Sequence, residues 1–153
     1  MMTRRSFLKG AALVGFALPP FLRFGQAGAD PVLAFVFFRS YSDHSDIPDN
    51  GTFDISTHGN RVESVISLAG VTQTKTYTVC VEVFQMDAFG QFSISIADTE
   101  YQRQLIAGQV GPIAKWWEAF HDNGTYRYVA ELMDGPTVVN SITRTFTVVG
   151  GPK

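Results

Sequence analysis

The chain has 153 residues, 45% hydrophobic and 17% charged, with 12 basic residues, 14 acidic residues and one cysteine. Its length suits one domain with a leader, and its slightly acidic balance argues against a nucleic-acid-binding protein, which needs a basic surface. A single cysteine excludes an internal disulfide, so stability has to come from a packed core.

The first 29 residues have the three-part layout of an export signal. A charged start precedes an apolar stretch from about Gly10 to Leu22, and small residues follow at 27–29. The segment TRRSFLK at 3–9 resembles the twin-arginine consensus, a Ser or Thr followed by Arg-Arg-x-Phe-Leu-Lys. The resemblance implies recognition by the twin-arginine translocase through four residues: Arg4, Arg5, Phe7 and Leu8.

The apolar stretch is shorter than the roughly 20 residues that cross a bilayer, and Pro19, Pro20 and Arg23 interrupt its end. We therefore expect a twin-arginine signal peptide over 1–29, a single domain over 30–153 and no permanent membrane span after cleavage, with a retained anchor as the alternative. The expected location is periplasmic or secreted. Residues 30–153 keep eight basic residues against 14 acidic ones, a net charge of −6 that repels nucleic acid.

Alternation of apolar and polar residues predicts strands through most of the remaining chain. In TYTVCVEVF at 76–84, Tyr77, Val79, Val81 and Val83 share one face, which we expect to be buried. An apolar run opens the domain at 32–38, and alternation recurs at 91–97, where Ile94 and Ile96 should face inward, at 125–132 and at 144–149. Weaker strands are expected at 52–56, 62–68 and 104–110. About eight short strands between turn residues predict an all-β antiparallel sandwich.

The segment DNGTYRY at 122–128 resembles the D-x-G-x-Y-x-C motif of immunoglobulin-like sandwiches. The resemblance implies that Tyr126 is the corner tyrosine, whose hydroxyl bonds to nearby main chain. Tyr128 stands where that family has its second cysteine, so no disulfide between sheets is implied. The motif supports an immunoglobulin-like version of the sandwich and says nothing of function.

Residues 112–121 interrupt the alternation. Ile113, Trp116, Trp117 and Phe120 stand at i, i+3, i+4 and i+7, the spacing of a helical stripe. With Pro112 suited to a first helical position, the pattern predicts a short helix near residues 112–121. A strand with Trp116 and Trp117 on opposite faces is the alternative.

The same segment supplies the candidate recognition residues Trp116, Trp117 and Phe120. Aromatic residues on an apolar stripe pack into cores, but an exposed aromatic platform binds a protein partner, a second copy or a sugar ring. We expect a protein partner or self-association, and a carbohydrate-binding module is the alternative.

The polar stretch 43–58 contains four candidate metal ligands: Asp43, His44, Asp46 and His58. Carboxylate and imidazole groups suit calcium or a transition metal. Their spacing does not match the calcium loop of an EF-hand, and a solvated acidic loop with turn residues is the favoured interpretation of this stretch.

No catalytic or cofactor motif is present, since the chain lacks H-E-x-x-H, C-x-x-C, G-x-S-x-G and a phosphate-binding glycine loop. Cys80 lies beside Glu82, which disfavours a reactive thiolate. We therefore expect an exported, non-catalytic binding or accessory module of the bacterial envelope without a cofactor. A periplasmic metal-binding protein and an enzyme without a visible motif remain alternatives.

Overall fold

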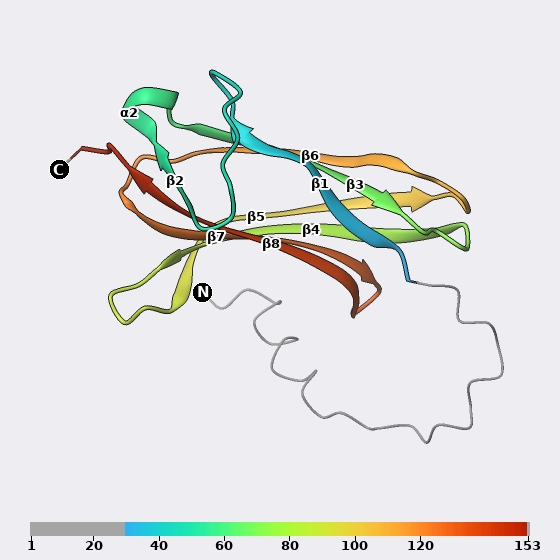
Figure 1. Cartoon of the computed structure of the whole chain (residues 1–153). Helices are drawn as coiled ribbons and strands as arrows, with labels where there is room; N and C mark the ends of the chain where they lie inside the picture. Colours follow the sequence, from blue (N-terminus) through green and yellow to red (C-terminus); the bar gives the residue numbers. More distant parts are fainter. Residues whose placement is uncertain (1–29, 153) are drawn as a thin grey trace.

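The computed structural model describes residues 30–152, which form two sheets packed face to face (Figure 1). The elements follow in chain order: β1 (Val32–Ser40), β2 (Gly51–Asp54), α2 (Ile55–His58), β3 (Arg61–Ala69), β4 (Lys75–Met86), β5 (Phe92–Leu105), β6 (Gly111–Ala119), β7 (Gly124–Asp134) and β8 (Thr137–Val149). Across this part of the chain, no helix has both the length and the apolar composition needed to cross a membrane.

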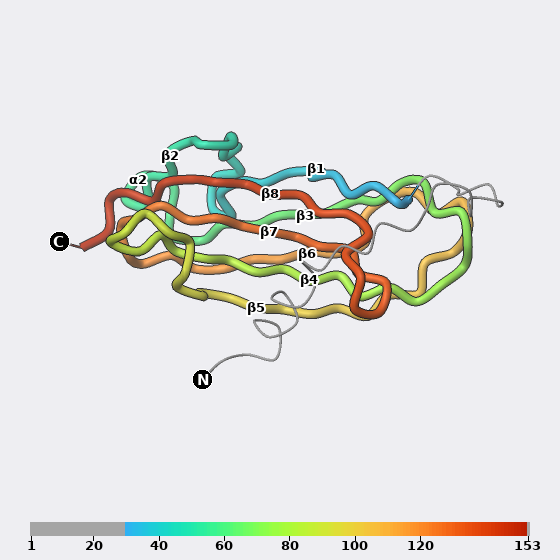
Figure 2. The backbone as a smooth tube through the Cα atoms, turned by 90° about the horizontal axis from the view of Figure 1, so that it is seen from below, coloured from blue at the N-terminus to red at the C-terminus, as the bar shows by residue number. Residues whose placement is uncertain are grey.

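One sheet has the strand order β1-β3-β6 and the other the order β2-β8-β7-β4-β5. Neighbouring strands are antiparallel except β2 and β8, which run parallel. Figure 2 shows the long strands of both layers running lengthwise along the molecule, as in aligned sandwiches. The prediction of an all-β sandwich is confirmed.

The core lies between the two sheets and is centred on aromatic rings. The inward row predicted for β4 is buried, since Val79, Val81 and Val83 have no exposed surface and Tyr77 is 8% exposed. The Tyr128 ring of β7 lies 4.9 Å from that of Trp116 and 5.3 Å from that of Phe38, centroid to centroid. Its buried hydroxyl accepts a hydrogen bond from Ser64 Oγ at 3.0 Å, as a polar atom in a core requires.

The corner contact implied by DNGTYRY is present at the start of β7. Tyr126 donates its hydroxyl proton to the main-chain oxygen of Asp122 at 2.9 Å. Its ring packs against those of Phe120 and Phe146, at centroid distances of 4.9 Å and 5.8 Å. The connection from β6 to β7 is therefore closed by a hydrogen bond and by aromatic packing.

The predicted helix at 112–121 is wrong, because this segment forms strand β6. The pairing with β3 advances from Ile66 opposite Ala114 to Ser67 opposite Pro112, so Ile113 is an extra residue at a β-bulge. The bulge leaves Ile113 and Ala114 both buried and shifts the alternation that follows. Because of the bulge, Ile113 and Trp116 are both buried although they are three residues apart, which is the i, i+3 spacing of a helix.

Two further expectations fail at β5. Residues 106–110, predicted as strand, form a turn after Leu105. Ile94 and Ile96, predicted to be inside, are 45% and 39% exposed. β5 is the edge strand of the five-stranded sheet, and the opposing sheet of three strands is too narrow to cover it fully.

Candidate functional site

The outer surface of the β1-β3-β6 sheet carries the exposed tryptophan of the candidate recognition residues. We call this surface the Trp117 face, and its residues point away from the core: Phe37, Arg39, Arg61, Glu63, Val65, Lys115 and Trp117. Register places Glu63 of β3 between Arg39 of β1 and Trp117 of β6. The guanidinium carbon of Arg61 lies 5.1 Å from the centroid of the Trp117 ring, within the range of a cation–π contact.

The three candidate recognition residues separate in the structure. Trp116 and Phe120 are 3% and 2% exposed and belong to the core, whereas Trp117 is 53% exposed. Since successive side chains of a strand point to opposite faces, the change from helix to strand sends Trp117 outward. Of the three, Trp117 alone can contact a partner while the domain stays folded, because the other two lie in the core.

Glu63 organises the charges of this face from its centre. Its side chain is 3% exposed, and its carboxylate accepts from Arg39 Nε at 2.9 Å. Lys115 Nζ and His44 Nδ1 lie 3.6 Å and 3.4 Å from the same carboxylate. A buried carboxylate is tolerated only when cations and hydrogen bonds compensate its lost hydration, so Glu63 holds these side chains in place.

Sequence reasoning missed the basic residues around Trp117. They come from β1, β3 and β6, which are distant in sequence and meet only through sheet pairing. One signal in the sequence could have found them. If 61–69 is a strand, Arg61, Glu63 and Val65 alternate with buried residues and must lie together on its outer face.

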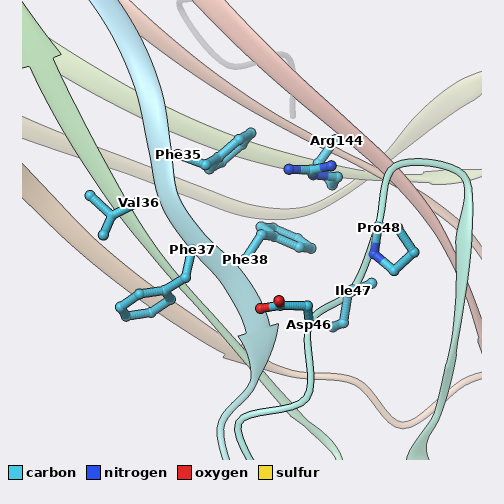
Figure 3. Close-up of a pocket in the computed structure, with 8 residues that line it drawn as sticks. All are labelled: Phe35, Val36, Phe37, Phe38, Asp46, Ile47, Pro48 and Arg144. Carbon is cyan, nitrogen blue, oxygen red and sulfur yellow. The ribbon is translucent and has the colours of Figure 1, made fainter.

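The residues predicted to bind metal are distributed over three places. His44 contacts Glu63 on the Trp117 face. Asp46 forms a β-bridge with Arg39 and lines a crevice of about 330 Å³ between β1 and β8 (Figure 3). Asp43 and His58 contact each other. Among residues 30–152, no group of three or more His, Cys, Asp or Glu side chains lies close enough to hold a metal ion.

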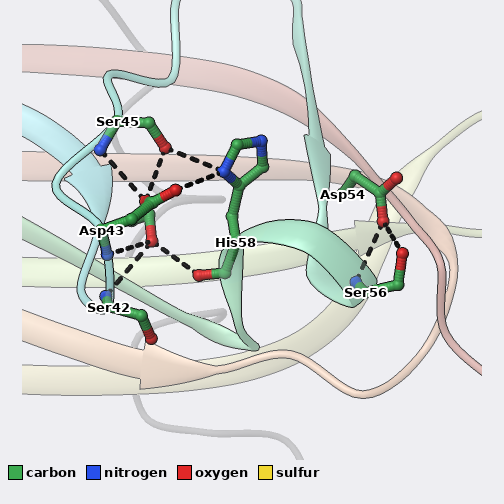
Figure 4. A network of polar contacts seen from close by, with 7 residues as sticks. Ser42, Asp43, Ser45, Asp54, Ser56 and His58 are labelled. Carbon is green, nitrogen blue, oxygen red and sulfur yellow. Dashed lines mark hydrogen bonds and ion pairs between the residues drawn. The ribbon is translucent and has the colours of Figure 1, made fainter.

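Asp43 and His58 form a polar network with the neighbouring serines (Figure 4). His58 Nδ1 lies 2.6 Å from Asp43 Oδ2, and Ser45 Oγ donates to Asp43 Oδ1 at 2.8 Å. Ser40 Oγ donates to the main-chain oxygen of His58 at 2.8 Å. Hydrogen bonds from His58 and from Ser45 hold the pKa of the Asp43 carboxyl well below its ordinary value.

This network does not have the geometry of a catalytic triad. In a triad the carboxylate and the serine bind opposite nitrogens of the imidazole, so that the ring can relay a proton between them. Here Ser45 Oγ lies 3.2 Å from His58 Nδ1, the nitrogen that also faces Asp43. The contacts tie the loop after β1 to the short helix α2. Asp54 is the N-cap of this helix and accepts a hydrogen bond from the main-chain N–H of Ser56.

Arg4, Arg5, Phe7 and Leu8, the residues of the export motif, lie outside the described residues.

No protein-family model matches the chain, and no curated protein matches it. Among solved structures, the chain is similar to part of a β-glucosidase from Kluyveromyces marxianus, with a TM-score of 0.40 and 6% identity over 79% of this chain. The match covers 15% of the length of that chain. A likeness at this level carries no functional argument.

Proposed function

We propose that the protein is an exported, non-catalytic binding or accessory module of the bacterial envelope, and that it engages a protein partner through the Trp117 face. The observation that carries the proposal is the exposure of Trp117, 53%, with the Arg61 guanidinium against its ring. Tryptophan and arginine are enriched among the residues that dominate the binding energy of protein interfaces. A large aromatic side chain on a regular strand also loses little conformational entropy on binding.

The charge of the face indicates the chemistry of the partner. Arg39 and Lys115 contact the buried carboxylate of Glu63, and Arg61 lies against Trp117 on the same face. Residues 30–153 as a whole, by contrast, have a net charge of −6. Such a local excess of positive charge favours an acidic surface on the partner and speeds its encounter. We therefore propose an acidic protein surface, on another envelope protein or on a second copy of this chain.

The export route implied by the twin-arginine resemblance fits this proposal. The twin-arginine route exports folded proteins, among them proteins that load a cofactor before export and proteins that travel with a partner. The sequence has no cofactor motif, so export together with a partner is the reason that we favour. A sugar-binding platform is the less favoured alternative, since the Arg61 guanidinium lies over the ring that a sugar would stack on.

Site-specific photocrosslinking tests the proposal. A photoreactive residue at position 65, which lies on the Trp117 face and keeps Trp117 itself in place, should give one defined adduct in cells, with a second protein or a second copy. The same residue at 106, in the turn before β6, is the matched control, because Ile106 is exposed, at 61%.

With the partner purified, Trp117→Ala should weaken binding by about 2 kcal/mol, roughly 30-fold. Absence of any adduct specific to position 65, together with a monodisperse monomer, would contradict the proposal. Saturable binding of soluble glycans would favour the carbohydrate alternative.

A further inference from the structure

The crevice between β1 and β8 is built around an arginine that faces the core. It is lined by Phe35, Val36, Phe37, Phe38, Asp46, Ile47, Pro48 and Arg144 (Figure 3). Arg144 lies opposite Tyr128 in the pairing of β8 with β7, and two residues before Phe146; neither Tyr128 nor Phe146 has exposed surface. The arginine thus occupies the inward row of β8, where sandwich strands carry apolar side chains.

The guanidinium of Arg144 has aromatic neighbours and no anionic one. Its central carbon lies 5.0 Å from the ring centroid of Phe35 and 5.7 Å from that of Phe38. Within residues 30–152, no carboxylate forms an ion pair with it, and its Nε is buried without a hydrogen-bond partner. The cation–π contacts offset part of the cost of desolvating the charge, but they leave the Nε–H unpaired.

The acidic residue that shares the crevice does not supply the missing partner. Figure 3 shows the Asp46 carboxylate on the other side of the Phe38 ring from the guanidinium. On the Trp117 face, by contrast, Glu63 and Arg39 are in direct contact at 2.9 Å. Within residues 30–152 the buried carboxylate of Glu63 is therefore paired, whereas the guanidinium of Arg144, a half-buried residue, has no ion pair.

Hydrogen bonds fix the walls of the crevice on both sides. Ile47 donates its N–H to the oxygen of Phe38 at 3.0 Å, which seats the 46–48 segment on the edge of β1. Thr145 donates its N–H to Asp49 Oδ1 at 2.8 Å, and Asn50 donates to the oxygen of Thr145 at 2.6 Å. The crevice is thus preformed, and its size falls at the lower end of small-molecule sites.

We propose that this crevice binds a carboxylate joined to an apolar group. The carboxylate would accept hydrogen bonds from the two terminal nitrogens of Arg144, one of the two-point geometries that guanidinium and carboxylate share. The apolar group would lie against Phe35 and Pro48, which line the crevice and keep exposed surface. A free aromatic or aliphatic acid and the carboxyl terminus of a peptide both have this chemistry.

Side-chain NMR spectra of the ¹⁵N-labelled protein test the site directly. Titration with 3-phenylpropionate should shift the Arg144 Nε–H resonance saturably, and 3-phenylpropanamide, which has the same shape without the charge, should bind at least tenfold more weakly. N-acetylphenylalanine and its amide repeat the comparison for a peptide carboxyl terminus and distinguish the two sources. Equal responses to an acid and its amide, or no response to either acid at millimolar concentration, would overturn the proposal.

Variants of Arg144 provide the second measurement. Arg144→Met removes the charge at similar length, so it should lose at least tenfold in affinity for 3-phenylpropionate while its thermal midpoint stays equal or rises. Arg144→Lys keeps the charge without the planar fork and should also bind more weakly. Arg103→Met changes an exposed arginine of β5 and should bind as the unmodified protein does. Unchanged binding by both Arg144 variants would refute the site.

Discussion

The hydroxyl of Tyr126 donates a hydrogen bond to the main-chain oxygen of Asp122, four residues earlier, at 2.9 Å. This bond closes the turn that leads from β6 into β7, and so it fixes where the central strand β7 begins in the five-stranded sheet. Burial, and then the Asp122 charge, raise the pKa of the phenol, so the hydroxyl stays protonated as a donor at neutral pH.

Tyr126→Phe should reduce the free energy of unfolding by about 1 kcal/mol, because it deletes this hydrogen bond and keeps the ring in its aromatic packing. Chemical denaturation monitored by circular dichroism measures the loss. Tyr41→Phe is the matched control, since Tyr41 is 45% exposed and its replacement should leave stability unchanged. Equal stability of the two variants would mean that the corner bond contributes nothing.

The two adjacent tryptophans should respond oppositely to truncation. Trp116→Ala opens a cavity beside Tyr128 and should cost about 3 to 5 kcal/mol of stability, whereas Trp117→Ala should cost less than about 1 kcal/mol. Thermal unfolding of both variants measures the difference. Trp116→Phe, which removes less volume, provides an intermediate value if the alanine variant does not fold. A Trp117→Ala protein as unstable as Trp116→Ala would place Trp117 in the core and remove the basis of the proposed interface.

The network around Asp43 should make stability depend on acid pH. Its folded-state pKa is depressed, so its contribution is fully present above the ordinary pKa of 3.8 and is lost as pH falls from there toward the lower folded value. Asp43→Asn should therefore lower stability at neutral pH and flatten the decline of stability below about pH 5. Denaturation midpoints between pH 2 and pH 7 measure the slope.

Asp54 and Asp87, whose pKa values are also depressed by hydrogen bonds, should still cause part of the loss of stability at acid pH in this variant. An unaltered acid slope in the Asp43→Asn variant would contradict this assignment.

Replacement of Arg4 and Arg5 by lysine should leave the precursor in the cytoplasm, because the twin-arginine pair is recognised as an address rather than as charge. Cell fractionation followed by immunoblotting measures the distribution. Lys9→Arg, which preserves both the charge and the arginine pair, is the control and should be exported normally. Normal export of the double lysine variant would remove the twin-arginine assignment.

The sequence was sufficient where the signal is local. The period-2 pattern of Tyr77 to Val83 predicted which face of β4 is buried, and DNGTYRY predicted the corner contact of Tyr126. Both depend on neighbouring residues alone, since alternation follows from the geometry of a single strand and the corner bond spans four residues.

The sequence was misleading at β6, where pairing with another strand determines the structure. The bulge at Ile113 exists because β6 has one more residue than β3 across the same span, and no window within 111–119 reveals this. Because the segment is a strand and not a helix, Trp116 and Trp117 lie on opposite faces, and the candidate interface is reduced from three aromatic residues to one.

Only the tertiary structure decided the composition of the two proposed sites. The alternation that places Phe146 and Val148 inside also predicts an inward Arg144, so the position of this arginine follows from the sequence. That no carboxylate within 30–152 reaches it depends on how β1 packs against β8, far apart in the chain. Arg39 and Lys115 likewise meet Glu63 only after three distant strands have paired. Strand geometry fixes the face on which a side chain lies, whereas its partners are set by long-range packing.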